Sequence, residues 1–261
     1  MKNHGKNPGN RAVVYGINAC LSVIEDTPER ILSAWVSRGR TEDSRFVSLL
    51  EQLNSCGIRV QEALNDFLDE KSGGGVHQGV VLEIKAVPPQ NERFLKELLK
   101  RAEGNQLYLV LDGITDQGNL GAALRCAWAA GVDAVIVPRD RSAGLGGAAR
   151  KSASGAAEKV PLVVVTNLAR TLDLLHEHGI ETVGLAAGGS DLLFDYDFQP
   201  KTALVLGSEG SGMRRLTSEK CDAMVRIPMA EGVESLNVSA AAAVSLFEVV
   251  RRFGLKHPGT P

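Results

Sequence analysis

Cysteine and aromatic residues are scarce in this chain of 261 residues: there are four cysteines, and Phe, Trp and Tyr make up only 5%. The cysteines lie far apart and form no CxxC pair, which argues against a zinc cluster and favours reduced, mostly buried thiols. No apolar run approaches the roughly 20 residues of a membrane-spanning helix. The polar N-terminus has no apolar segment behind it, so no signal peptide is expected. These absences predict a soluble, cytoplasmic protein that does not use a membrane.

A strong excess of charge of one sign is missing as well. The formal net charge is −2, which disfavours a histone-like binder of any nucleic acid but is compatible with a local basic patch. Hydrophobic residues make up 44% of the chain, which is enough for a core and excludes general disorder. The 28 glycines and the alanine-rich second half predict packing through small residues and close backbone contacts.

The apolar segments divide the chain into two parts. Alternating strand-like and helix-like segments predict a small α/β domain over residues 1–86, and the polar stretch after a diproline predicts a linker over 87–92. A second domain is expected over 93–261. Its continuously apolar strands are typical of a parallel sheet covered by helices on both faces, so we predict an α/β fold. These strands are expected at 107–112, 133–138, 160–166, 180–187, 202–207 and 222–228.

Polar and glycine residues follow three of these strands, at the sheet edge where open α/β folds bind ligands. The first segment is NLGAALRCAWAAGV (119–132), in which Asn119 is predicted to cap a helix. Arg125 then projects between the small residues Gly121 and Ala129. A ligand or another chain could approach it closely, although an ordinary cap and a solvated arginine would look the same.

The other two segments are LVLGSEGSGMRRL (204–216) and IPMAEGVESLNVSAAAAVSLFE (227–248). Glycines on both sides of Glu209 let a ligand approach the backbone, or they form a plain surface turn. In the third segment Ser235 and Asn237 precede an alanine-rich helix that must pack closely against another surface. Asn237 would be a natural cap for that helix.

Basic residues gather near these segments, and they are either phosphate contacts or a solvated surface. They are Arg139, Arg141, Arg150 and Lys151 after one strand, and Arg214 and Arg215 in the second segment. GLGGAA (144–149) matches a dinucleotide fingerprint, but it starts well past its strand and lacks the acidic residue expected about 20 positions later. A nucleotide-dependent oxidoreductase is therefore disfavoured. P-loop chemistry is disfavoured too, because Arg150 stands where that motif needs glycine.

Taken together and in this order, the three segments resemble motifs 1, 2 and 3 of the SpoU (TrmH-like) ribose 2′-O-methyltransferases. The stretches from YGINACLSVIE to HQGVVLEI are similar to the L30e-like RNA-binding domain that precedes the catalytic domain in this family. VPRDRSAGL and VTNLARTL point to the members that methylate a guanosine in the peptidyl-transferase P loop of 23S rRNA. A tRNA or another rRNA site is the alternative substrate. An RNA-binding protein without catalytic activity is the alternative function.

The resemblance implies a C-terminal catalytic domain with a deep trefoil knot, S-adenosylmethionine bound in that knot, a homodimer, and RNA rather than DNA as substrate. By matching position, the cofactor would contact Gly207, Ile227 and Leu236. The active site would contain Asn119, Arg125, Glu209, Ser235 and Asn237, with Arg125 at the subunit interface. The RNA would contact the basic residues named above, together with Lys2, Lys6 and Arg11.

In-line transfer from a sulfonium requires alignment of three atoms and no metal. A guanidinium has a pKa above about 12, so we expect Arg125 to stabilise the forming alkoxide rather than to act as a base. Asn119 and Glu209 would hold Arg125 and the ribose, and Ser235 and Asn237 would shape the cofactor loop. The chain departs from the family pattern in two places: Gln117-Gly118 replaces Pro-His, and AEGVES replaces AGSVES.

Overall fold

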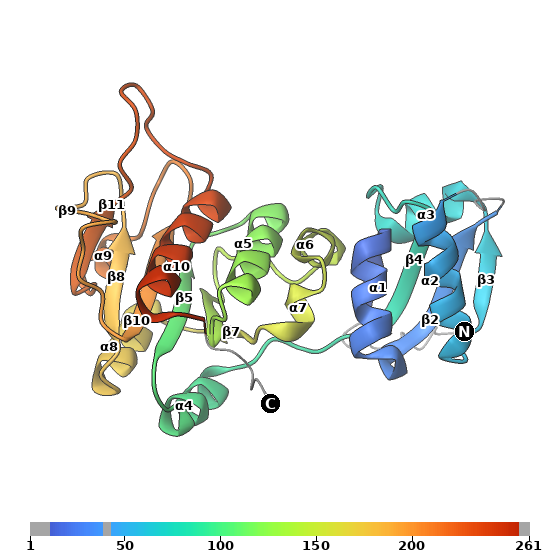
Figure 1. The fold of residues 1–261 in the computed structure, drawn as a ribbon, viewed down its shortest axis with the longest axis horizontal. Coiled ribbons are helices and arrows are strands. Elements are labelled where there is room, and N and C mark those ends of the chain that lie inside the picture. Colours follow the sequence, from blue (N-terminus) through green and yellow to red (C-terminus); the bar gives the residue numbers. More distant parts are fainter. Residues whose placement is uncertain (1–10, 39–42, 256–261) are drawn as a thin grey trace, which may run out of the picture.

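The computed structural model describes residues 11–38 and 43–255. Residues 11–85 form a four-stranded sheet with strand order β1-β4-β2-β3, which we call the N-terminal unit (Figure 1). Strand β4 is antiparallel to β1 and β2, whereas β2 and β3 are parallel. The elements are β1 (Arg11–Tyr15), α1 (Ile17–Asp26), the 3-10 helix η2 (Pro28–Arg30), β2 (Ile31–Ser37), α2 (Ser44–Ser55), β3 (Val60–Ala63), α3 (Asn65–Ser72) and β4 (Val80–Lys85).

Helices cover both faces of this small sheet. Helices α1 and α2 contribute Ile17, Val23 and Phe46 to a core with the inward residues of the strands. On the other face, Leu68 of α3 packs with Tyr15. Strand β3 begins at Val60, and α3 begins at Asn65 after an extended Leu64.

The second part, which we call the C-terminal unit, contains a seven-stranded sheet in the order β7-β6-β5-β10-β8-β11-β9, and every strand pair is parallel. Its strands are β5 (Gln106–Asp112), β6 (Ala134–Pro138), β7 (Leu162–Val165), β8 (Glu181–Leu185), β9 (Asp191–Leu192), β10 (Lys201–Gly207) and β11 (Ala223–Arg226). Its helices are α4 (Glu92–Arg101), α5 (Gln117–Ala129), α6 (Gly147–Ala153), α7 (Ala156–Lys159), α8 (Leu168–Glu177), α9 (Arg215–Glu219) and α10 (Val238–Phe253).

The apolar strands are buried on two sides, as the sequence predicts. In β5, Leu109 points into a core shared with α5 and α10, while Tyr108 points into a second core shared with α4 and α8. The predicted α/β fold with a parallel, doubly covered sheet is therefore confirmed. The short strand β9 and the helix α6 were not predicted, and α6 lies in a stretch that the sequence suggests is a loop.

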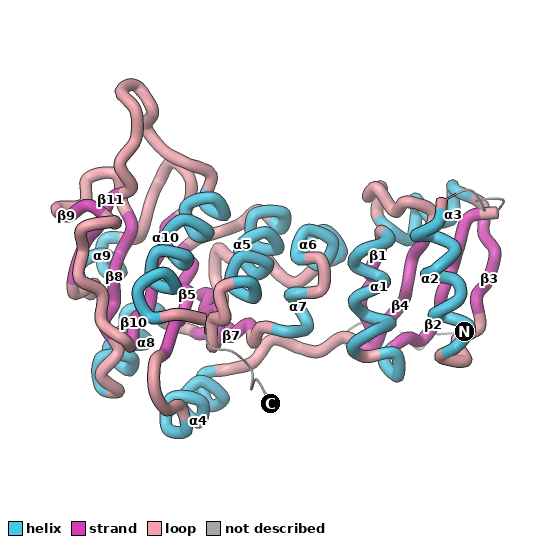
Figure 2. The backbone as a smooth tube through the Cα atoms, viewed as in Figure 1, coloured by secondary structure: helices cyan, strands magenta, loops and turns pink. Residues whose placement is uncertain are grey.

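Parallel strands bring their carboxyl ends to one edge of the sheet. Strands β5 and β10 are neighbours, with Gly207 paired to Asp112 at their ends. The segments after β5, β10 and β11 therefore leave the sheet at the same edge. Figure 2 shows the long coil segment between β11 and α10 projecting from that end of the molecule.

The polar stretch between the two units is attached to the sheet. The Gln90 amide donates to the Leu162 carbonyl at 2.8 Å, and the Gln90 carbonyl accepts from the Val164 amide at 2.9 Å. Gln90 thus forms a parallel bridge with edge strand β7. No helix in the described part of the chain is long and apolar enough to cross a membrane. Of the free cysteines, Cys20 is buried and Cys56 is exposed, so burial of the thiols is only partial.

Candidate active site

Three residues from three distant segments form one hydrogen-bonded cluster. Glu209 Oε1 accepts from Asn237 Nδ2 at 2.7 Å and from Asn119 Nδ2 at 3.2 Å. It also accepts from the backbone amide of Val238 at 3.1 Å. Asn237 Nδ2 in turn lies 2.9 Å from Asn119 Oδ1. The fold therefore joins one polar residue from each of the segments singled out in the sequence.

Two helices position this cluster through their first turns. Asn237 is the N-cap of α10 and accepts from the Ser239 amide at 3.0 Å, as predicted. The prediction that Asn119 caps α5 is wrong, because Asp116 is the cap and accepts from the Asn119 amide at 2.7 Å. Asn119 lies inside the first turn, so its side chain is available to Glu209. Since helix N-termini favour negative charge, both helices suit a carboxylate here.

An ion pair between an exposed arginine and a buried carboxylate fixes the loop that carries Glu209. Asp112, which is 1% exposed, ends β5 and accepts from Arg214 Nε at 2.7 Å and from the Arg214 amide at 2.9 Å. Gly207 lets the same loop fold back, because a Cβ there would lie 2.1 Å from the Gly212 carbonyl carbon. No real Cβ tolerates that distance, so the turn after β10 requires glycine at this position.

A cavity of about 310 Å³ lies beside the cluster. Gly207, Ile227 and Leu236 line it, as do Ser235 and Glu209. The apolar walls suit an adenine ring, and the carboxylates of Glu209 and Glu234 suit hydroxyl groups and positive charge. The residues present therefore fit S-adenosylmethionine. The sequence motifs did not point to seven further lining residues: Leu185, Ala186, Ala187, Leu206, Met229, Val238 and Ala241. The small pair AA directly after a strand was the available signal for two of them.

Arg125 is exposed on α5 and makes no hydrogen bond or ion pair with any residue that the structure describes. The expectation that Glu209 and Asn119 hold it is not met, because those two side chains bind each other and Asn237. Helix geometry explains the separation: Arg125 is six positions after Asn119, which places the two side chains on different faces of α5.

The predicted RNA contacts divide into exposed and engaged residues. Arg139 and Arg141 are exposed in the segment after β6, and Arg215 is exposed on α9, where it pairs with Glu219. Arg214 is held by Asp112. Lys2 and Lys6 lie outside the described residues, and Arg11 pairs with Glu83 at 2.8 Å.

The prediction is wrong for Arg150. This side chain is 4% exposed and forms an ion pair with Glu158 instead of facing solvent. Its neighbour Lys151 donates from Nζ to the Val76 carbonyl at 2.7 Å and lies over the Tyr15 ring. Arg150 therefore stabilises the packing of α6 against α7, and Lys151 connects α6 with the N-terminal unit. The sequence pattern of basic residues does not contain this information.

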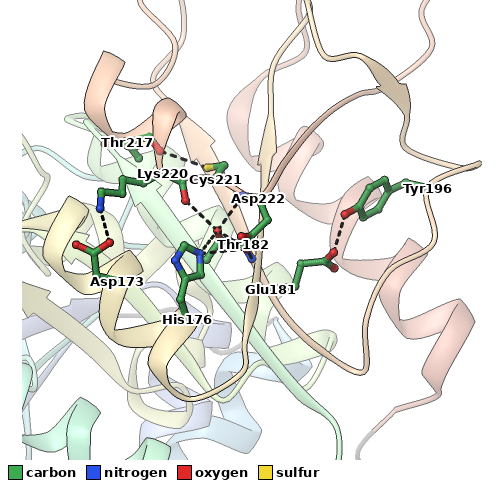
Figure 3. Close-up of polar contacts among 9 residues, drawn as sticks. All are labelled: Asp173, His176, Glu181, Thr182, Tyr196, Thr217, Lys220, Cys221 and Asp222. Atoms are coloured by element: carbon green, nitrogen blue, oxygen red, sulfur yellow. Dashed lines mark hydrogen bonds and ion pairs between the residues drawn. The ribbon is translucent and has the colours of Figure 1, made fainter.

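A second polar cluster lies at the opposite, N-terminal end of β8 (Figure 3). His176 Nε2 lies 3.0 Å from Asp222 Oδ2 and 2.8 Å from Thr182 Oγ1. Asp222 also accepts from the Thr182 amide at 2.8 Å. Thr182 is fully buried, and the cluster joins α8 to the starts of two strands. Within residues 11–38 and 43–255, no group of three or more His, Cys, Asp or Glu side chains could hold a metal ion.

Comparison with known families agrees with this geometry. The model described as "SpoU rRNA Methylase family" matches residues 106–247. The chain belongs to this family. The model described as "RNA 2'-O ribose methyltransferase substrate binding" matches residues 13–90.

Similar proteins cover both units of this SpoU-family chain. A 23S rRNA (guanosine-2'-O-)-methyltransferase RlmB of Yersinia pestis is 50% identical over 244 residues, which cover 94% of this chain and 98% of that protein. The protein of the same name from Escherichia coli K12 is 48% identical over 240 residues, covering 92% and 98%. Among solved structures, the SpoU methyltransferase AviRb from Streptomyces viridochromogenes in complex with AdoMet has a TM-score of 0.74 at 23% identity. That match covers 96% of this chain and 94% of AviRb, and it supports the fold.

Proposed function

We propose that this chain transfers the methyl group of S-adenosylmethionine to the ribose 2′-oxygen of a guanosine in 23S rRNA, in the P loop of the peptidyl-transferase centre. The observation that carries the proposal is the identity of about 50% to proteins of that activity over nearly the whole chain. The cluster of Asn119, Glu209 and Asn237 beside a cavity that fits the cofactor supports it.

S-Adenosylmethionine supplies an activated methyl group on a sulfonium, which leaves as a neutral thioether. Gly207, Ile227 and Leu236 would hold the cofactor, with apolar walls around the adenine. Ser235 lines the same cavity on the segment before α10 and would shape the cofactor loop. Because no metal is needed for such a transfer, the work of the protein is alignment of the reacting atoms.

The polar residues would act on the ribose. Glu209 orients the amide of Asn119, which can then direct a hydrogen bond to a sugar hydroxyl. The positive charge of Arg125 would favour the alkoxide form of the 2′-hydroxyl as the methyl group is transferred. In this description Asn119 orients the substrate and Arg125 stabilises the developing negative charge.

A homodimer is part of this proposal. Trp128 on α5 is 45% exposed and Phe247 on α10 is 46% exposed, and these two helices pack together. Exposed aromatic side chains are enriched at interfaces between subunits. Arg125 lies one helical turn from Trp128 and is exposed, so a second copy covering this surface would bring Arg125 close to the substrate site of that copy.

Three further properties belong to the proposal through the family. They are the division into an L30e-like RNA-binding domain over residues 1–86, a linker over 87–92 and a catalytic domain over 93–261; a trefoil knot in that catalytic domain; and a cytoplasmic location, where ribosomal RNA is found. The separate cores of the two sheets support the division. The exposed Arg139, Arg141 and Arg215 would contact RNA phosphates. Arg214 is bound to Asp112 and would hold the loop of Glu209. A 2′-hydroxyl target requires RNA rather than DNA.

The test is a map of 2′-O-methyl groups in RNA from cells that lack the protein, with purified protein then added back. We expect one guanosine of 23S rRNA to lose its methyl group and to regain it with S-adenosylmethionine. Loss of a methyl group from tRNA or from another rRNA site would instead establish the alternative substrate. Absence of cofactor binding by calorimetry would favour an inactive RNA-binding protein.

A further inference from the structure

A buried ionic network connects the two units of the chain. The Glu158 carboxylate on α7 pairs with Arg150 on α6 and with Arg30, which lies just before β2 of the N-terminal unit. The three side chains are 5%, 4% and 12% exposed. Arg30 also donates from Nε at 3.0 Å and from Nη2 at 2.7 Å to the carbonyl of Lys85, the last residue of β4. One guanidinium therefore binds both the end of the small sheet and the other unit.

Further close contacts between the two units surround this network. Lys159 Nζ lies 2.5 Å from Asp26 Oδ1 at the end of α1. Gly155, just before α7, has a φ of +92°, and a Cβ there would lie 1.9 Å from Ser22 Oγ on α1. Only glycine allows α1 to approach this closely. Figure 1 shows α6 and α7 between α5 and α1. The surfaces of α1 and α7 are therefore complementary in shape as well as in charge.

The opposite side of α6 supports the active-site helix. Ser152 Oγ donates to the Gly118 carbonyl at 2.8 Å, in the first turn of α5. A Cβ on Gly121 would lie 2.2 Å from the Ala149 carbonyl oxygen, so α5 and α6 touch through their backbones. Helix α6 thus contacts both the N-terminal unit and the helix turn that carries Asn119.

We propose that Glu158 is a positioning residue that holds the RNA-binding N-terminal unit at a fixed place relative to Asn119, so that the bound guanosine presents its ribose to the methyl donor. The inference rests on the proposed function. Arg30 and Arg150 are two positive charges that share one buried carboxylate, and removing that carboxylate leaves both without a counterion. Burial and the nearby Arg30 lower the pKa of Arg150 to about 10, so the charged form of Arg150 is already disfavoured at this position.

Variants on each side of the contact between the two units test this proposal. Glu158→Gln removes the shared carboxylate. Arg30→Met removes the contact across the interface together with the two hydrogen bonds of Arg30 to the Lys85 carbonyl. Glu158 and Arg150 both belong to the C-terminal unit and remain paired. Arg30→Lys keeps the charge and is the conservative rescue. Arg93→Met is the matched control, since Arg93 is an 87% exposed partner of Glu97 on α4.

The measurements are the radius of gyration by small-angle X-ray scattering, cofactor affinity by calorimetry, and KM and kcat on a 23S rRNA fragment. For Glu158→Gln and Arg30→Met we expect a larger radius, unchanged cofactor affinity, and a KM raised about tenfold if the docked fraction falls to about a tenth. Arg30→Lys should have a radius and a KM close to those of the wild type, and Arg93→Met should match the wild type in both.

An unchanged radius and KM in Arg30→Met would overturn the proposal, and this variant decides the matter if Glu158→Gln does not fold. The same scattering data keep the two proposals separate. If the wild-type protein does not methylate the fragment, the proposed function fails, whereas the change in radius still reports whether the network fixes the units.

Discussion

Asn237 and Asn119 are 118 positions apart in the sequence, and a hydrogen bond of 2.9 Å joins their side chains. Each lies in the first turn of its own helix or at its cap, so the bond fixes the starts of α5 and α10 relative to each other. Glu209 accepts from both amides and completes the cluster. The site therefore depends on two helix starts rather than on one flexible loop.

Glu209→Gln should reduce turnover about 10- to 100-fold, which corresponds to the roughly 1.5–3 kcal/mol of a hydrogen bond to a charged group. All three bonds end on Oε1, and a neutral amide oxygen accepts them more weakly than the charged carboxylate does. Single-turnover methylation of a 23S rRNA fragment measures the effect. Wild-type turnover in this variant would show that the cluster has no part in catalysis.

Asn119→Ala should reduce turnover and leave cofactor affinity intact, because Asn119 lies beside the cavity and does not line it. Asp116→Ala is the matched comparison: it removes the cap of α5 and should cost about 1 kcal/mol of stability. Calorimetry, methylation kinetics and urea unfolding separate the two. If Asn119→Ala loses cofactor binding instead, the assignment to the ribose is wrong.

Arg125→Lys should keep measurable activity, and Arg125→Ala should lose about 100-fold or more in kcat, as expected for a group that stabilises a developing charge. The lysine retains the positive charge that this role needs. The exposed position of Arg125 means that neither change should lower the melting temperature appreciably. An inactive Arg125→Lys would instead indicate a role specific to the guanidine, such as proton removal.

Gly207→Ala should weaken cofactor binding by at least about tenfold, because overpacking of this kind typically costs 1–3 kcal/mol and displaces the loop. The new Cβ would lie 2.1 Å from both the Gly212 carbonyl carbon and the Met213 amide nitrogen. Gly144→Ala serves as control, since nothing lies within 4 Å of a Cβ there. Equal cofactor affinity in the two variants would contradict the tight turn.

Glu92 should contribute stability at neutral pH that disappears in acid. Its Oε1 accepts from Thr166 Oγ1 at 2.6 Å and from the Thr166 amide at 2.7 Å, and these bonds lower the pKa of Glu92. A lowered pKa in the folded state means that the contribution is complete above the unfolded value near 4.3 and is lost as the pH falls through the folded value.

Urea unfolding of wild type and Glu92→Gln tests this. The difference in unfolding free energy should be at most about 1 kcal/mol at pH 7 and should shrink towards zero below about pH 4. A difference that stays constant over this range would mean that the charge of Glu92 is not involved.

The sequence predicts the α/β fold, most of the strands and the segments that meet at the site, because each of these leaves a local pattern. Strand β5, for example, is apolar from Leu107 to Leu111 since it is buried on both faces. The cap of α5 was misassigned because Asp116 and Asn119 are equally suitable cap residues, and only the structure shows where the helix begins.

Long-range ion pairs leave no such pattern. In the sequence Arg150 resembles a phosphate contact, because nothing next to it indicates a partner. Its partner Glu158 is eight positions away, and Arg30, which shares that carboxylate, is 120 positions away. The same holds for Asp112, which ends a strand in the sequence and proves to anchor the loop of Glu209 through Arg214, 102 positions later. Burial and pairing of charges depend on tertiary structure, which local patterns do not contain.

The bridge between Gln90 and edge strand β7 also limits how far the halves of the protein can separate. Only residues 86–89 lie free between the end of β4 at Lys85 and the attachment at Gln90. A fully extended chain spans about 17 Å between the Cα atoms of Lys85 and Gln90. Such a short tether keeps a detached RNA-binding half at a high effective concentration next to its docking surface. The N-terminal half would then rebind rapidly within the same molecule. The two halves could separate to release the product and return to the docked arrangement afterwards.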